Sequence, residues 1–219
     1  GPGRQRADAG ARAGRGPVSG LSMALLNAEH LVFAPPRGLM ALSFSIRPGL
    51  TLVRGGEGRG KTSLLRAIAG ELAPAGGRLQ RAPGATVFQA HPLDARYDAR
   101  SAQDWLTQQA QGLTASWQAA LADRLVEDFA LAEHLAKPMA ALSSGSWRKL
   151  GLVAAAASGA TLTLLDGPYA ALDARSVRRL DALLAEAANQ AGRAWLLADY
   201  ALPAGLAQVR LAGLIDLGD

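Results

Sequence analysis

The stretch Gly55-Gly56-Glu57-Gly58-Arg59-Gly60-Lys61-Thr62 decides the fold, because it matches the pattern G-x-x-x-x-G-K-[ST] in full. In such a loop the glycines let backbone N–H groups point inward, the lysine reaches the outer phosphates and the following hydroxyl holds Mg²⁺. Lys61 is one of only three lysines, against twenty arginines. The planar guanidinium of Arg59 has the wrong shape for this point-charge role. The stretch therefore predicts a site for nucleotide phosphates.

The residues on both sides of this stretch fit such a loop. Leu50 to Val53 reads as a short buried strand, Thr62 to Ala69 reads as a helix with one apolar side, and Gly70 is placed to cap that helix. A strand, a glycine loop and a helix N-terminus form an anion site, because the helix dipole and the unpaired N–H groups both favour phosphate. The alternative, a glycine-rich turn that happens to contain Lys-Thr, leaves these flanks unexplained.

The composition fits one globular domain in a reducing compartment. The chain has 219 residues, and 49% of them are hydrophobic. The absence of cysteine excludes disulfides, thiolate metal sites and cysteine nucleophiles. The longest uncharged stretch, residues 150–165, is too short to span a bilayer and is interrupted at Ser158-Gly159. Any association with a membrane is therefore expected to come through a partner.

The net charge of +5 is concentrated near the amino terminus. Residues 1–22 contain four arginines and one aspartate, so they contribute +3 and the remainder contributes +2. This segment has few bulky apolar residues and is expected to be a disordered leader before a folded domain at 23–219. We interpret it as a tail, an added remnant or an upstream start rather than as a targeting peptide or a nucleic-acid arm. No basic stripe interleaved with aromatics is visible, so no nucleic-acid partner is expected.

The alternation of predicted strands and helices, together with the loop 55–62, predicts an α/β fold of the P-loop NTPase class. We expect a mostly parallel core sheet with helices on both faces, an antiparallel β edge and a small helical lobe at about residues 97–150. Asp173 has the position of a helix N-cap, and Ala212-Gly213 is expected to turn a final hairpin. The segments that carry this expectation are strands within 23–54 and 77–88, helices within 101–137, and core strands at 161–166 and 195–197.

Within the expected helical lobe, apolar side chains recur every four residues and predict a packed face rather than a binding site. Arg124 and Asp128 lie on another face, four residues apart, and are expected to pair. The recurring apolar residues are Trp117, Leu121, Leu125 and Phe129.

The order of these features resembles the nucleotide-binding subunit of ATP-binding cassette (ABC) transporters, over nearly all of residues 23–219. The resemblance implies ATP and Mg²⁺ as cofactors, with Phe33 stacking on adenine. It also implies that Thr62, Gln89 and Asp166 act at Mg²⁺, and that the loop Ala170-Ala171-Leu172-Asp173 crosses a dimer interface. The ATP-binding residues that it implies are Phe33, Gly55, Gly56, Glu57, Gly58, Arg59, Gly60, Lys61, Thr62, Ser63, Gln89 and Asp166.

The segment Leu142-Ser143-Ser144-Gly145-Ser146 stands where this family has LSGGQ and keeps three of its five positions. By the resemblance, Ser143 and Gly145, with Ser144 and Ser146 beside them, reach the γ-phosphate bound by the opposite subunit. The alternative is a Ser/Gly helix cap with no partner role, because serine is also a good N-cap.

Two positions depart from the family pattern. Gly167 follows Asp166 where the family has a glutamate that polarises the attacking water, and Asp199 stands near the place of the switch histidine. Loss of a positioned general base costs about 10² to 10⁴ in rate, or roughly 3 to 5 kcal/mol. No catalytic residue is therefore assigned. The combination implies an ATPase whose own hydrolysis is weak.

The leading hypothesis is an ATP-binding subunit that couples ATP binding, and slow or partner-dependent hydrolysis, to transport through a separate transmembrane subunit. It would act as a homodimer or heterodimer, peripheral on the cytoplasmic face of the inner membrane. A narrower resemblance points to the haem-exporter ATPase of cytochrome c maturation. One alternative is a non-hydrolysing, ATP-gated regulatory or scaffold module. Another is a P-loop kinase for small molecules, which would leave residues 142–146 unexplained.

Overall fold

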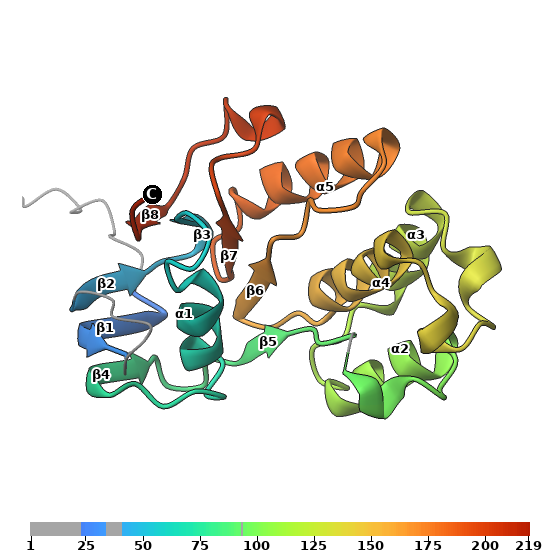
Figure 1. The fold of residues 1–219 in the computed structure, drawn as a ribbon, viewed down its shortest axis with the longest axis horizontal. Helices are drawn as coiled ribbons and strands as arrows, with labels where there is room; N and C mark the ends of the chain where they lie inside the picture. Colours follow the sequence, from blue (N-terminus) through green and yellow to red (C-terminus); the bar gives the residue numbers. More distant parts are fainter. Residues whose placement is uncertain (1–22, 34–40, 93) are drawn as a thin grey trace, which may run out of the picture.

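The computed structural model describes residues 23–33, 41–92 and 94–219, so the leader expected at 1–22 lies outside the described residues. Figure 1 shows two sheets at one end of the molecule and a group of helices at the other. The strands are β1 (Leu26–Val32), β2 (Leu42–Ile46), β3 (Gly49–Arg54), β4 (Gly76–Arg81), β5 (Val87–Gln89), β6 (Leu162–Asp166), β7 (Ala194–Asp199) and β8 (Gly213–Asp216). The helices are α1 (Lys61–Ile68), α2 (Ala102–Gly112), α3 (Ala119–Asp128), α4 (Ser144–Ala157) and α5 (Ala174–Ala187), with short 3-10 turns η1 (Ala95–Tyr97), η2 (Ala132–His134), η3 (Met139–Ala141) and η4 (Ala204–Leu206).

The predicted fold class is confirmed. The core sheet has the order β5-β6-β7-β3-β8 and all its strand pairs are parallel, whereas the edge sheet has the order β2-β1-β4 and is antiparallel. Parallel strands need covering on both faces, which explains why β3, β6 and β7 are runs of apolar residues rather than alternating ones. The carboxyl ends of β3, β5, β6 and β7 lie at one edge of the core sheet, and functional sites of open α/β sheets form there.

Two apolar clusters cover the two faces of the core sheet. Leu52 and Trp195 pack on one side with α4, α5 and the helical lobe, and Val53 and Leu196 pack on the other side with α1 and the antiparallel sheet. Successive residues of one strand therefore pack into different apolar clusters, because side chains alternate between the two faces of a sheet. The described helices include none with both the length and the apolar character to cross a membrane.

The helical lobe comprises α2, α3 and α4. The expected apolar stripe packs there: Leu125 and Phe129 are buried, and Trp117 and Leu121 are partly buried against the same cluster. The expected pairing of Arg124 with Asp128 is wrong. Asp128 accepts a hydrogen bond from Arg179 Nε on α5 at 2.6 Å. An exposed i,i+4 pair stabilises by only a few tenths of a kcal/mol, so a partly shielded partner on another helix displaces it.

The expected hairpin at Ala212-Gly213 is also wrong. The residues before it run through η4 and form no strand, and β8 pairs with β3 in parallel. Ala212 N–H donates to Leu50 O at 2.8 Å, and Leu217 N–H donates to Arg54 O at 2.7 Å. The unpaired edge of β3, rather than the local turn signal, decides the direction of the last strand.

One buried arginine ties the end of α4 to the core sheet. Arg193, 9% exposed, donates to the carbonyls of Ala155 and Ala156 at 2.8 and 3.1 Å and to Thr163 Oγ1 at 2.8 Å. Its guanidinium also lies 4.2 Å from the centre of the Trp195 ring. Burial lowers its pKa to about 10, so it stays charged at neutral pH. A cation on the last carbonyls of a helix satisfies them and complements the helix dipole.

Candidate functional site

The loop between β3 and α1 has the geometry that its glycines predict. Gly58 and Gly60 have φ of +74° and +98°, a region that L residues with side chains rarely adopt. Gly60 precedes α1 and has no side chain to cap the first N–H groups of that helix, so these groups are left to bind an acceptor from outside the helix. A hollow of about 330 Å³ lies over the loop, lined by Gly56, Glu57, Gly58, Gly60, Lys61, Thr62 and Ser63.

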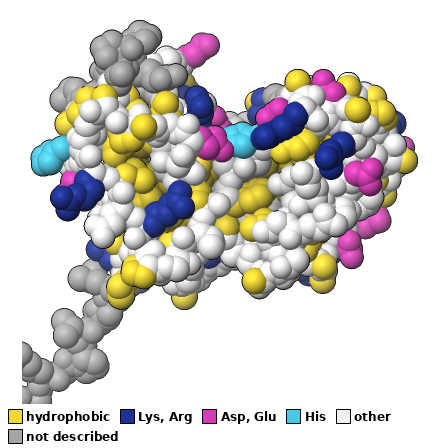
Figure 2. Space-filling view, turned by 90° about the horizontal axis from the view of Figure 1, so that it is seen from below, with side chains coloured by type: hydrophobic (Ala, Val, Ile, Leu, Met, Phe, Trp, Pro, Cys, Tyr) yellow, Lys and Arg dark blue, Asp and Glu magenta, His cyan; other side chains and the backbone are white. Residues whose placement is uncertain are grey.

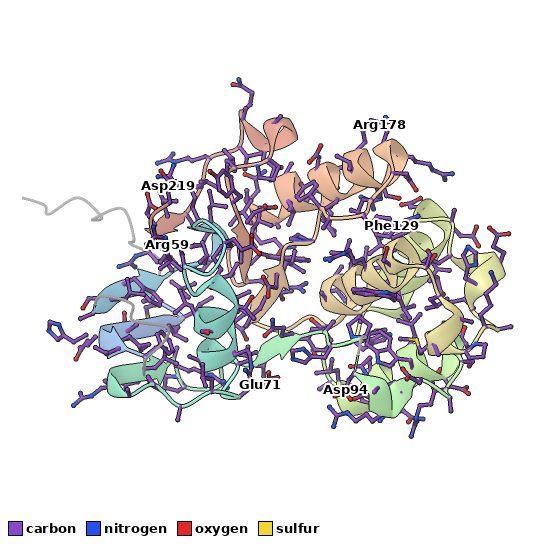
Figure 3. The ribbon with its side chains drawn as sticks, in the orientation of Figure 1. Arg59, Glu71, Asp94, Phe129, Arg178 and Asp219 are labelled. Carbon is purple, nitrogen blue, oxygen red and sulfur yellow. The ribbon has the colours of Figure 1, made fainter. Side chains whose placement is uncertain are left out.

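Lys61 lies over the interior of this loop. Its Nζ donates to the carbonyl oxygens of Gly55 and Gly56, the latter at 2.9 Å. These carbonyls hold the ammonium in position without neutralising it. Glu57, Gly58 and Arg59 are exposed, and Figure 3 labels Arg59 at the loop before α1. The loop therefore presents one fixed positive charge together with backbone N–H donors, which suits a phosphate group.

Thr62 joins the loop to the end of β6. Its Oγ1 donates to Asp166 Oδ2 at 2.7 Å. Gln89 ends β5, the strand beside β6, and its buried Oε1 has no hydrogen-bond partner within the described part of the chain. A hydroxyl, a carboxylate and an amide oxygen are hard donors of the kind that Mg²⁺ prefers, and Mg²⁺ takes its other ligands from water and phosphate. The residues present therefore fit ATP and Mg²⁺.

A groove continues from this point between α1 and the helical lobe. It has a volume of about 610 Å³, and its lining includes Thr62, Gln89, His91, Arg148 and Asp166. Figure 2 shows the molecule hollowed between its two halves, with a histidine among acidic and basic side chains in the hollow. Figure 3 shows Glu71 on the α1 side and Asp94 on the lobe side. His91 Nε2 and Glu71 Oε1 are 2.8 Å apart. The candidate Mg²⁺ end of the site is thus continuous with an open, charged groove.

The segment 142–146 forms the start of α4. Ser143 is its N-cap: the Ser143 hydroxyl accepts from Ser146 N–H at 3.1 Å and donates to Ser146 Oγ at 3.0 Å. Ser143 and Ser144 are exposed and Ser146 is buried. A Cβ at Gly145 would lie 2.8 Å from Ala171 O, so only glycine fits that close approach. The N-cap alternative thus describes the geometry of Ser143, and a role in trans stays a proposal for the exposed serines.

The loop 170–173 is fixed to α4 and α5. Asp173 caps α5 by accepting from Ser176 N–H at 2.8 Å, and Lys149 Nζ lies 3.0 Å from Asp173 Oδ2. The hydrogen bond from the Ser176 backbone, followed by that from Lys149, lowers the pKa of Asp173 to about 2. Asp173 is therefore ionised at neutral pH and unsuited to proton transfer there.

Gly167 follows Asp166 in a left-handed turn, with φ of +53°. Its N–H donates to Ala198 O at 2.9 Å, and its carbonyl accepts from Arg148 at 2.9 Å. An ideal Cβ built at this position meets no described heavy atom within 4 Å. The place of the family glutamate thus holds a pinned backbone turn with free space beside it.

Asp199 ends β7, next to β6. Its Oδ1 accepts from Tyr200 N–H at 2.7 Å, so part of its hydrogen-bonding capacity serves its own turn. A carboxylate lacks the proton donor that an imidazolium offers to a phosphate, and its charge opposes the phosphate charge. Asp199 is therefore a poor substitute for a histidine at this place.

Phe33 is buried in the core beneath the antiparallel sheet, with only 3% of its surface exposed. Stacking on adenine needs an accessible ring face. The role that the resemblance implies for Phe33 therefore remains a proposal that the position of the ring does not favour.

Three features together define an ABC-type P-loop NTPase: a parallel sheet with a phosphate-binding loop after β3, an aspartate at the end of β6, and a helical lobe whose α4 begins at the serine-glycine segment 142–146. The chain belongs to the ABC transporter family, whose model matches residues 39–170, more than half of the chain. It is an ATP-binding subunit of that family. Members bind ATP, usually with Mg²⁺, hydrolyse it, form dimers and work with transmembrane subunits.

Individual relatives show which members of the family this chain is similar to. The chain is 35% identical over 182 residues to the cytochrome c biogenesis ATP-binding export protein CcmA of Sphingopyxis alaskensis, covering 82% of this chain and 88% of that protein. It is 36% identical over 203 residues to the protein of the same name from Rhodobacter capsulatus, covering 88% of each. A solved ATP-binding subunit of an ABC transporter superposes with a TM-score of 0.69 at 20% identity, covering 84% of this chain and 82% of that one, which concerns the fold alone.

Sequence reasoning missed Arg148, which contacts the turn after Asp166 from the first half of α4. Its place directly after Trp147, two residues beyond the segment 142–146, was visible in the sequence. Its contact with the Gly167 carbonyl was not visible in the sequence, because residues 148 and 167 come together only when α4 packs beside β6.

Proposed function

We propose that this chain couples ATP binding, with slow or partner-dependent hydrolysis, to transport through a separate membrane subunit. The relatives named for export in cytochrome c biogenesis support export as the direction and that pathway as the context. The proposed location is the cytoplasmic face of the inner membrane, where a transmembrane partner holds the chain.

The observation that carries this proposal is the contact of 2.7 Å between Thr62 Oγ1 and Asp166 Oδ2. It brings the phosphate-binding loop and the end of β6 to one point, with the Lys61 ammonium over the loop. Thr62, Asp166 and Gln89 would hold Mg²⁺, and residues 55–63 would hold the phosphates. When bound, Mg²⁺ would supply positive charge that offsets the negative charge of the phosphates. The chain's own residues thus supply binding and orientation.

Weak intrinsic hydrolysis is proposed from the two residues that follow or end the core strands at the site, Gly167 after β6 and Asp199 at the end of β7. Gly167 offers no carboxylate to take a proton from water, and Asp199 adds negative charge where the family has a histidine. A missing general base alone raises the barrier by roughly 3 to 5 kcal/mol. Hydrolysis that depends on a partner remains compatible with these residues, because the other subunit of a heterodimer can carry the complete site.

The proposed dimer, with itself or with another ATP-binding subunit, uses the start of α4. Ser143, Ser144, Gly145 and Ser146 would act in trans on ATP held by the opposite subunit. The exposure of Ser143 and Ser144 at a helix N-terminus supports this role, since backbone N–H groups and an exposed serine hydroxyl there suit an anion.

Calorimetry with Mg·ATP on wild type, Lys61→Ala and Lys137→Ala tests the proposal. Lys61→Ala removes the cation over the loop and should weaken binding at least tenfold. Lys137, which contacts His134 on the lobe, is the matched control and should bind as wild type does. Equal binding by all three proteins would show that the loop is not the nucleotide site.

A second candidate is a non-hydrolysing, ATP-gated regulatory or scaffold module. The same Gly167 and Asp199 favour it, because the phosphate-binding loop is present while the family's glutamate and histidine are replaced. Turnover measured with and without the membrane partner separates the two. Acceleration by the partner supports the transport ATPase, whereas ATP binding with no turnover in either condition supports the module.

A further inference from the structure

Arg148 is an unusual residue to find beside the end of β6. Its side chain lies between α4 and the turn after Asp166, with one NH group on Gly167 O at 2.9 Å and its guanidinium 5.2 Å from the centre of the Trp147 ring. Its Nε is buried without a hydrogen-bond partner among the described residues. Burying part of a guanidinium is costly unless its contacts compensate for the lost water. The partial burial of Arg148 therefore suggests a structural or functional role that a solvent-exposed arginine on the same helix would not have.

The turn that Arg148 contacts is pinned on both sides. Gly167 N–H is held by Ala198 O, Gly167 O is held by Arg148, and the preceding side chain, Asp166, accepts from Thr62. These three contacts fix residues 166 and 167 between β7, α4 and α1. Removing Arg148 leaves the Gly167 carbonyl without its partner and frees one side of a left-handed turn. The Asp166 carboxylate is attached directly to that turn.

Arg148 also lies near Gln89, because both side chains line the same small hollow. Gln89, Arg148 and Asp166 line a small hollow of about 90 Å³, and the buried Gln89 Oε1 and Arg148 Nε are an acceptor and a donor without described partners. A hollow of this size has room for water, which a donor and an acceptor together can hold. Arg148 is thus positioned to align both Asp166 and Gln89, the two residues that extend from β6 and β5 toward Thr62.

We propose that Arg148 is a positioning residue that holds the Asp166 end of β6, and with it Gln89, in the arrangement that makes ATP binding depend on Mg²⁺. It acts through the Gly167 carbonyl rather than by touching the nucleotide. Because Arg148 lies on α4, the helix that begins within the segment 142–146, it connects the start of α4 to the proposed Mg²⁺ site of the same chain. This inference rests on the proposed function, because it concerns the same ATP site.

The test compares ATP affinity with excess Mg²⁺ and with EDTA, by calorimetry, for wild type, Arg148→Gln and Arg179→Gln. Arg148→Gln should weaken binding at least fivefold with Mg²⁺ and less than twofold with EDTA. Arg179→Gln is the matched control: it also removes an arginine contact between elements, but that contact joins α5 to Asp128 and lies outside the lining of the site groove. It should leave both affinities within twofold of wild type.

Arg148→Lys guards against failure of Arg148→Gln to fold, because it keeps the positive charge beside Trp147 while losing the planar fork of the guanidinium. It should weaken binding about twofold to fivefold, with Mg²⁺ only. Equal losses with and without Mg²⁺, or no loss in either variant, would overturn the positioning role. If wild type itself fails to bind ATP, the proposed function falls and this inference falls with it. If wild type binds and loses binding in Lys61→Ala, a negative result for Arg148 concerns Arg148 alone.

Discussion

Gly167→Glu is the change that tests the hydrolytic deficit most directly, because it adds the carboxylate that the end of β6 lacks. Space does not limit it, since no described heavy atom lies within 4 Å of an ideal Cβ there. Its cost is backbone strain: Gly167 has φ of +53°, and a residue with a side chain in this region loses about 1 to 2 kcal/mol. In a domain of this size that lowers Tm by about 2 to 8 °C.

The gain in rate is limited by two neighbours. A positioned general base contributes about 10² to 10⁴ in rate. Arg148, however, lies on the Gly167 carbonyl at 2.9 Å, and a guanidinium beside a carboxylate lowers its pKa by about 1 to 3, which weakens it as a base. Asp199 also remains in this single variant, and its negative charge still opposes the phosphate charge. We therefore expect Gly167→Glu to gain about tenfold or less, and Gly167→Glu with Asp199→His to gain more, because both missing groups are then replaced.

Steady-state phosphate release at saturating Mg·ATP measures these gains, with Lys61→Ala as the background for contaminating activity. Gly167→Ala is the matched control, since it carries the same strain without a carboxylate. It should melt at the same reduced temperature as Gly167→Glu and gain no rate. Equal rates for the alanine and glutamate variants would refute the reasoning. So would vigorous turnover by the unmodified chain, which would require another base.

Two further predictions concern stability. Phe33→Ala should lower Tm strongly, because a nearly buried ring leaves a cavity that costs about 3 to 5 kcal/mol, while ATP affinity changes less than in Lys61→Ala; a loss of affinity at unchanged Tm would instead favour adenine stacking. Arg193→Ala should cost about 1 to 3 kcal/mol in urea unfolding, because Ala156 O and Thr163 Oγ1 lose a buried donor while Ala155 O keeps its hydrogen bond from Ser158 Oγ; an unchanged free energy of unfolding would contradict the role of Arg193 as a cap for α4.

The sequence was sufficient for features that arise from neighbouring residues. The loop 55–62, the buried strand ending at Asp166 and the N-cap at Asp173 are all decided by short patterns, and the structure contains each of them. Contacts between distant segments were not predictable in this way. The direction of β8 depends on the free edge of β3, and the partner of Asp128 depends on where α5 lies relative to α3. Arg193 and Arg148 gain their roles only from packing.

The close approach between Gly145 and Ala171 O has a consequence for genetics. Since a Cβ at residue 145 would lie 2.8 Å from that carbonyl, any side chain there forces the backbone at residue 171 or the start of α4 to shift. Loss of activity in a Gly145 variant would therefore report damage within the subunit, whether or not a second subunit ever contacts it. A complementation screen for the dimer contact should instead vary Ser144, which is exposed and is not the residue that caps α4.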